Sequence, residues 1–456
     1  MPLDLKTNLL LTACGAIVAA AAATAGLTQA SAGPAGSLRS EYEAIGYNEV
    51  ARDNPVARLG EDLKSGKVTL EYKGEHGYLE SLLKALDIDP SSQVLVYSKT
   101  SLQHPHITAQ TPRAIYFNED TYIGWVQGTH LIEVTTTDAK LGSVYYLFHN
   151  APDVDEHVER KTHACLNCHD TYGNMGGGVP ELLAGSAVVN RQGNRLTEKF
   201  GVTRVTDATP LDDRWGGWYV TGQSGQQAHM GNILIDSLSE MPSLDAVRRE
   251  NIDSLDELNY LDTSHYLEPT SDIVALLVLE HQVTVINQLT YVKFKAPVVL
   301  QRMGHAEAVK ASTWDALPPD ARKVLSRMLD DLVAHMLFVG ATEFKDQVSG
   351  SPQYTAWFEG RGPRDKEGRS LRDFDLKTRL FKHPVSFLIY STDFNTLPPY
   401  AKDYVYRRIA AVLEGHDNDP AYTHISKDER RAAMEILAET KPDFAPYLDT
   451  QAALNR

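Results

Sequence analysis

The stretch AIYFNEDTYIGWVQGTHLIEVTTTDAKLGSVYYLFH, residues 114–149, contains short runs in which apolar and polar residues alternate. These runs are rich in Val, Ile, Tyr and Thr, and Asn-Glu-Asp, Gly-Thr and Leu-Gly separate them. An alternation with a period of two is typical of strands that bury one face. With QVLVYS at residues 93–98, the stretch predicts four or five antiparallel strands, and HGYLESLLKALDI at residues 76–88 predicts a helix before them.

A different periodicity appears after residue 242. Apolar residues recur there at spacings of three and four, which indicates helices that bury one face. The segment SDIVALLVLEHQVTVINQLTYVKF is expected to be a largely buried helix, and Pro-Pro or Ser-Lys-Asp mark the starts of the others. The predicted helices span residues 271–294, 317–338, 397–415 and 426–440, and a polar stretch breaks the series between residues 345 and 390.

Glycine-rich segments lie between these two regions. They include GNMGGGVP, WGGW and TGQSGQ, and no helical period is sustained there. Loops of such length in a compact protein usually carry function. We therefore expect an α+β protein with an antiparallel sheet region at residues 33–150, a loop-rich segment at 151–242 and a mainly α-helical domain at 243–456.

The N-terminus predicts export from the cytoplasm. LLLTACGAIVAAAAATAGL is an uncharged, largely apolar run, and Ala30-Ser31-Ala32 offers the small-x-small pattern of signal peptidase. We expect a signal peptide over residues 1–32 and a periplasmic or secreted mature protein. Two alternatives stay open: an uncleaved anchor formed by residues 9–27, and a lipoprotein that begins at Cys14. No later segment is expected to span a membrane.

The composition limits the partners. Lysine and arginine number 44 against 60 acidic residues, so the formal net charge is −16. Nucleic acid and anionic lipid would be repelled at long range by such a surface. A redox partner protein or a small-molecule substrate is the expected partner. Hydrophobic residues make up 42% of the chain and charged residues 23%, as in an ordinary globular protein.

Apart from Cys14, cysteine occurs only in KTHACLNCHD, residues 161–170. Cys165, Cys168 and His169 match Cys-x-x-Cys-His, the attachment sequence for c-type haem. Two thiols at this spacing reach the two vinyl groups of one porphyrin, and the next histidine becomes the proximal iron ligand. Random placement of the 3 cysteines and 16 histidines would produce about 5 × 10⁻⁴ such matches. The motif therefore predicts one covalent haem c.

Other uses of the two thiols are less consistent with the sequence. A thioredoxin-like pair lies at a helix start within a βαβ unit, whereas this pair follows an antiparallel region and a charged segment. A zinc site would need two more ligands, and the adjacent Cys168 and His169 cannot readily both bind one tetrahedral metal. A plain disulfide stays open, although it leaves His169 without a role.

The motif makes the chain resemble c-type cytochromes. A wider set of segments is similar to a family of large secreted bacterial proteins that carry a single haem-attachment sequence. The resemblance supports a haem and an extracytoplasmic location, and it implies no particular reaction. Its segments are TPRAIYFNEDTYIGWVQG, the motif, RWGGWYVTG, QQAHMGN, SDIVALLVLEHQ and GRSLRDFDLKTRLFKHPVSFLIYS.

The second axial ligand would decide between a carrier and a catalyst. His229 is the first candidate distal ligand and Met230 the alternative, because both follow a glycine-rich loop that could fold back over the iron. A loop histidine that serves only as a hydrogen-bonding group is the structural alternative. Met175 would have to cross the porphyrin edge, and packing against the ring is favoured for it. His163 is too close to the motif to reach the distal face.

Other side chains have both a structural and a functional interpretation. His281 could line a haem pocket, but a hydrogen-bonded core residue is the commoner role for such a histidine. For a cluster of three aromatic residues, packing in the core is the default interpretation. For four arginines, ion pairs with nearby Asp and Glu residues are favoured over ion pairs with haem propionates. The aromatic cluster is Trp215, Trp218 and Tyr219, and the arginines are Arg361, Arg364, Arg369 and Arg372.

Three functions follow from a single haem. The first is a periplasmic monohaem cytochrome that transfers electrons between partners, with redox catalysis at the iron as an extension. The second is a peroxidase-like or oxidase-like haem oxidoreductase with an open or displaceable distal site. The third is a haem-based sensor or binding module. A single motif excludes a two-haem c-type peroxidase.

Overall fold

The structure is a computed structural model that describes most of the chain after the expected signal peptide. The leader at residues 1–32 and Met175 both lie outside the described residues. The described residues are Tyr42 and residues 45–170, 178–196, 202–236, 251–417 and 419–448.

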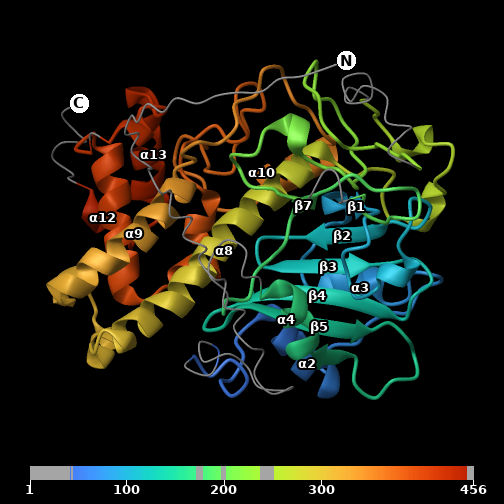
Figure 1. Cartoon of the computed structure of the whole chain (residues 1–456), viewed down its shortest axis with the longest axis horizontal. Helices are drawn as coiled ribbons and strands as arrows, with labels where there is room; N and C mark the ends of the chain where they lie inside the picture. Colours follow the sequence, from blue (N-terminus) through green and yellow to red (C-terminus); the bar gives the residue numbers. More distant parts are fainter. Residues whose placement is uncertain are drawn as a thin grey trace, which may run out of the picture. The chain divides into compact units, whose positions relative to one another are not determined.

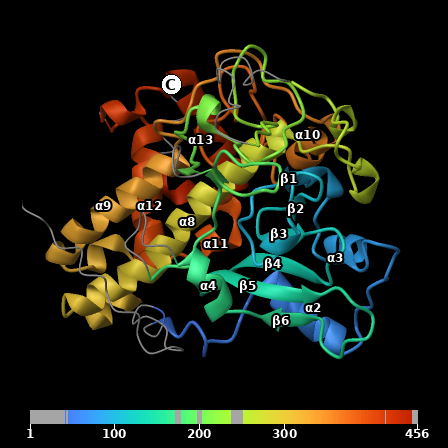
Figure 2. The ribbon, with the colours of Figure 1, turned by 45° about the vertical axis from the view of Figure 1, so that its right-hand side comes forward.

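A six-stranded antiparallel sheet occupies the N-terminal half, with its strands in sequential order. The strands predicted between residues 93 and 149 are confirmed, and a short strand that the sequence did not predict, β6, pairs with β5 at the edge. Figure 1 shows β1 to β5 stacked one below the other, and Figure 2 shows β6 beside β5. The strands are β1 (Val94–Val96), β2 (Arg113–Phe117), β3 (Thr121–Trp125), β4 (Leu131–Asp138), β5 (Gly142–His149) and β6 (Val158–Arg160).

The register of β4 and β5 places directly paired residues on the same face of the sheet. Glu133 pairs with Leu147, and Thr135 pairs with Tyr145. Side chains alternate between the faces along a strand, so Tyr145 and Tyr146 point to opposite sides. All of β5 except its last residue is buried, because both faces of this strand are covered by other parts of the protein.

Helix α8 (Ile273–Arg302) is the central element of the C-terminal half. Asp272 caps its N-terminus by accepting a hydrogen bond from the Ala275 N–H. The helix continues past the predicted end at residue 294 and through Pro297, because the following Val298 and Leu300 are buried and maintain the apolar period. It is long and apolar enough to cross a membrane, but 94% of its most apolar window is buried inside the protein.

The predicted C-terminal helices are confirmed and lie on the side of α8 away from the sheet (Figures 1 and 2). Pro319 and Pro399 occupy first-turn positions, and Ser426 forms a capping box with Glu429. A shorter helix, α10, lies inside the interval expected to interrupt the series. The helices are α9 (Pro319–Met336), α10 (Pro352–Glu359), α11 (Thr392–Asn395), α12 (Pro399–Leu413) and α13 (Lys427–Thr440).

The expected α+β class is therefore observed at the level of an N-terminal sheet and C-terminal helices. Residues Leu38–Arg456 form one compact unit. Short elements connect the two halves, and α2 (Pro55–Lys64) and α3 (Leu79–Ala85) precede the sheet. The connecting elements are α4 (His163–His169), β7 (Gly185–Ser186) and β8 (Thr203–Arg204).

Candidate functional site

The Cys-x-x-Cys-His motif forms the short helix α4, which directly follows β6. Leu166 is buried and anchors the helix, whereas Cys165 is half-buried and Cys168 is exposed. Both thiols are free. Burial, with the nearby Glu133 as a second cause, raises the pKa of the Cys165 thiol to about 12. Neither thiol forms a disulfide.

The side chain and the main chain of His169 both form hydrogen bonds with the main chain of Glu181. Its Nδ1 lies 2.7 Å from the main-chain oxygen of Glu181. The Glu181 N–H donates in return to the His169 carbonyl, at 2.9 Å. A carbonyl oxygen can only accept, so Nδ1 carries the hydrogen and Nε2 holds a free lone pair. Burial lowers the pKa of His169, which keeps the imidazole neutral near pH 7.

Residues from β5 and α8 surround the Glu181 segment. The Tyr145 hydroxyl on β5 donates to the Glu181 carbonyl at 2.8 Å, and its ring lies 4.7 Å from the His169 ring. Asn287 on α8 exchanges two hydrogen bonds with the main chain of Leu182, at 2.8 and 2.9 Å. The Glu181 carboxylate pairs with Arg204 at 2.9 Å. The sequence analysis did not identify these residues.

A charged pair lies close to the same helix. Arg113 Nη2 on β2 is 2.7 Å from Glu133 on β4. Gly124 on the intervening strand makes this possible, since a Cβ there would lie 2.2 Å from Arg113. The main-chain N–H of Gln103 donates to Glu133. Among the described residues, Arg113 Nε and both polar atoms of the Gln103 side-chain amide are buried without a hydrogen-bond partner. Orphaned polar atoms of this kind indicate space for a polar group or water.

Two apolar side chains are exposed beside this site. Leu183, two residues after Glu181, has 45% of its surface accessible, and Val202 has 49%. Val202 packs against Gly185, where a Cβ would lie 3.5 Å from its Cγ1.

His229 and Met230 are placed in a different set of contacts. His229 is buried, and its ring lies 5.3 Å from the Trp215 ring. Its Nδ1 accepts the Gly231 N–H at 3.1 Å, so the hydrogen lies on Nε2, and burial lowers its pKa to about 4. Met230 packs near Ile233. Among the described residues, these contacts do not involve α4. The role of His229 as the distal ligand therefore stays a prediction.

His281 is a hydrogen-bonded core residue. Its Nδ1 lies 3.0 Å from Asp207 and its Nε2 lies 2.8 Å from the hydroxyl of Ser386. The three side chains follow the order of a hydrolase triad, but His281 and Ser386 are both fully buried. Phe338 stacks on the imidazole at 4.7 Å. A substrate has no access to this hydroxyl, so the network is structural.

The remaining sequence candidates have structural contacts. His163 is exposed. Trp215, Trp218 and Tyr219 are buried, as expected for packing. The four arginines pair with carboxylates close in space: Arg361 with Asp87 and Glu119, Arg372 with Glu119, Arg364 with Asp373, and Arg369 with Asp365 and Glu435.

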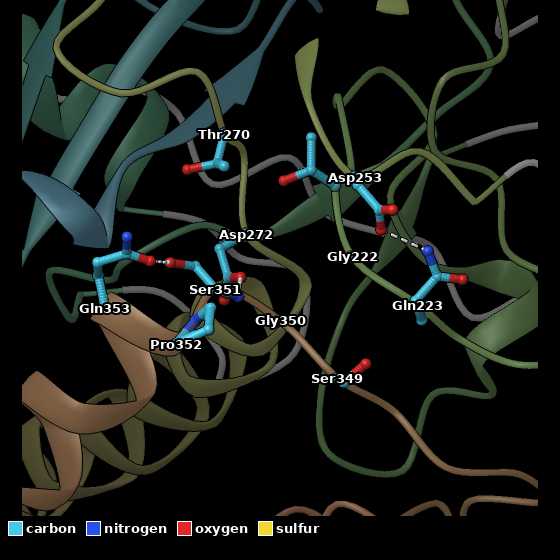
Figure 3. Close-up of a pocket in the computed structure, with 11 residues that line it drawn as sticks. Gly222, Gln223, Asp253, Thr270, Asp272, Ser349, Gly350, Ser351, Pro352 and Gln353 are labelled. Carbon is cyan, nitrogen blue, oxygen red and sulfur yellow. Dashed lines mark hydrogen bonds between the residues drawn. The ribbon is translucent and has the colours of Figure 1, made fainter.

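A separate pocket of about 310 Å³ lies where α8 and α10 begin (Figure 3). Asp272 lies at its centre and accepts hydrogen bonds from Ala275 and from the Ser351 N–H, which joins the two helix starts. At its edge the Gln223 amide donates to Asp253 at 2.5 Å. Asp272 is fully engaged by main-chain donors, so its observed role is structural.

The buried carboxyl group of Asp272 should make the free energy of unfolding depend on pH. Burial raises its pKa from an ordinary value near 3.8 to about 6. The folded state therefore binds this proton more tightly, and the associated stability is lost as the pH rises through 6. From pH 4.5 to 7.5 the free energy of unfolding should fall by about 2 kcal/mol relative to Asp272→Asn, which does not titrate. Chemical denaturation at several pH values measures this difference, and a constant difference contradicts the assignment.

Comparison with protein-family models, with curated proteins and with solved structures finds no match to this chain. In the part of the chain that the structure describes, no group of three or more His, Cys, Asp or Glu residues is placed to hold a metal ion. The zinc alternative therefore lacks its additional ligands among these residues. The resemblance to c-type cytochromes stays a prediction.

Proposed function

We propose that the chain is a periplasmic or secreted monohaem c-type cytochrome that transfers electrons. In this proposal Cys165 and Cys168 hold one haem through thioether bonds, and His169 is the proximal ligand of its iron. When bound, the haem supplies a one-electron redox centre. The loop-rich segment between the sheet and the helices is then its binding region.

The hydrogen bond from His169 Nδ1 to the Glu181 carbonyl carries the proposal. A histidine that binds a metal through Nε2 almost always donates its other N–H to a carbonyl, carboxylate or water. The bond selects the required tautomer and holds the ring orientation. The lowered pKa of His169 acts in the same direction, because only the neutral imidazole has the lone pair that a metal needs.

The surroundings fit a porphyrin whose edge reaches the surface. Cys168 is exposed and Cys165 is half-buried, so both sulfur atoms are accessible to an incoming cofactor. Leu183 and Val202 provide exposed apolar surface next to the Glu181 segment. A haem edge at the surface suits electron exchange with a partner protein, and the net charge of −16 favours a basic partner.

The test is production of the full chain in a host with cytochrome maturation and in one without it. The matured protein is expected to be coloured and to carry the mass of one haem. A low-spin spectrum that carbon monoxide leaves unchanged supports the carrier, whereas immediate carbon monoxide binding supports the haem oxidoreductase. A colourless protein without added mass in the maturing host overturns the proposal.

A further inference from the structure

The main-chain carbonyl of Glu181 accepts hydrogen bonds from two side chains at once. His169 Nδ1 donates to it at 2.7 Å, and the Tyr145 hydroxyl donates to it at 2.8 Å. A carbonyl oxygen has two lone pairs, so both bonds can form together. The tyrosine therefore contacts the group that orients the proximal histidine without touching the imidazole nitrogens.

This carbonyl is held in place by two elements of the fold, α4 and α8. The Glu181 N–H bonds back to the His169 carbonyl on α4. Asn287 on α8 binds both the N–H and the carbonyl of the next residue, Leu182. Both Asn287 and Leu182 are buried, so water does not compete for these bonds. The carbonyl cannot shift far toward either donor, and the two donors share it at fixed positions.

Two donors on one oxygen weaken each other. Each draws electron density from the acceptor, so the tyrosine hydrogen bond reduces the charge available to His169 Nδ1–H. A weaker bond at Nδ1 leaves the imidazole less anionic and makes it a weaker donor to iron. Such a ligand stabilises the ferric state less, and the reduction potential is higher.

From this geometry we infer that Tyr145 is a positioning residue that limits the His169–Glu181 hydrogen bond and thereby raises the reduction potential of the haem iron. The inference rests on the proposed function for its redox consequence. Its structural part, a weakened Nδ1–H bond, concerns the chain's own residues and can be measured without haem.

The redox test compares Tyr145→Phe with Tyr146→Phe in the haem-loaded protein. Tyr146 is the matched control, because it is the next residue of β5, is also buried, and bonds through its hydroxyl to Asn54 on the other side of the sheet. Tyr145→Phe is expected to lower the equilibrium constant for reduction about threefold to tenfold, roughly 30 to 60 mV for a one-electron couple. An unchanged potential, or an equal shift in the control, overturns the inference.

The second test uses nuclear magnetic resonance of the haem-free full chain with labelled histidines. Tyr145→Phe is expected to move the His169 Nδ1–H resonance downfield, because a single donor makes a stronger hydrogen bond. Tyr146→Phe should leave it in place. This result stands whether or not the matured protein carries haem, so failure of the proposed function and failure of this inference can be told apart. No shift in Tyr145→Phe refutes the role of the tyrosine.

Discussion

Replacement of both Cys165 and Cys168 with alanine is expected to abolish covalent haem attachment completely. Thioether bonds need the two sulfur atoms, and after Cys14 the sequence contains no other cysteine. The double variant made in a maturing host should have the mass of the bare polypeptide, and its denatured chain should show no haem absorbance. Each single variant retains one sulfur and is expected to carry less haem than the wild-type protein.

Loss of haem in the double variant should not result from unfolding. Cys168 is exposed and Cys165 is half-buried, and alanine is a good helix former, so α4 should persist. We expect the free energy of unfolding of the haem-free protein to change by less than about 1 kcal/mol. His163→Ala is the matched control, because it changes an exposed residue of the same helix and leaves both thiols in place. An unchanged mass increment in the double variant would place the attachment elsewhere.

The sheet and the main helices could be predicted because their signals are local. Alternation over a few residues suffices for β4, and spacing of three and four suffices for α9. The short strand β6 could not be predicted, since three residues, Val158–Arg160, contain too little pattern. The extension of α8 through Pro297 was missed because the tertiary packing of the following residues, rather than helix propensity, maintains the helix there.

The site was predictable only in part for a related reason. Cys165, Cys168 and His169 have a fixed spacing that the sequence displays directly. The partner of His169 is a main-chain oxygen, and a main-chain group gives no residue-type signal. Asn287 lies 105 residues from Leu182, and its contact with that residue depends on how α8 packs. Contacts of this kind become visible only once the chain is folded.

The second large effect is expected at Asn287. Its replacement with alanine removes both hydrogen bonds to Leu182 and leaves a buried N–H and a buried carbonyl without partners. Each unsatisfied group costs about 1–3 kcal/mol, so the free energy of unfolding should fall by about 2–6 kcal/mol. Hydrogen exchange at the Leu182 and Glu181 amides should accelerate, because the segment that orients His169 loses its anchor on α8.

Gln282→Ala provides the control for this prediction. Gln282 is a buried amide side chain on the same helix, and among the described residues its one hydrogen bond is a long one, accepted from the Tyr122 hydroxyl at 3.3 Å. We expect Gln282→Ala to lower the free energy of unfolding by about 1 kcal/mol and to leave hydrogen exchange at the Leu182 amide unchanged. If the two variants had the same free energy of unfolding and the same rates of amide hydrogen exchange at Leu182 and Glu181, α8 would not hold the Glu181 segment. The orientation of the proximal histidine would then depend on the other contacts of Glu181, which include α4, Tyr145 and Arg204.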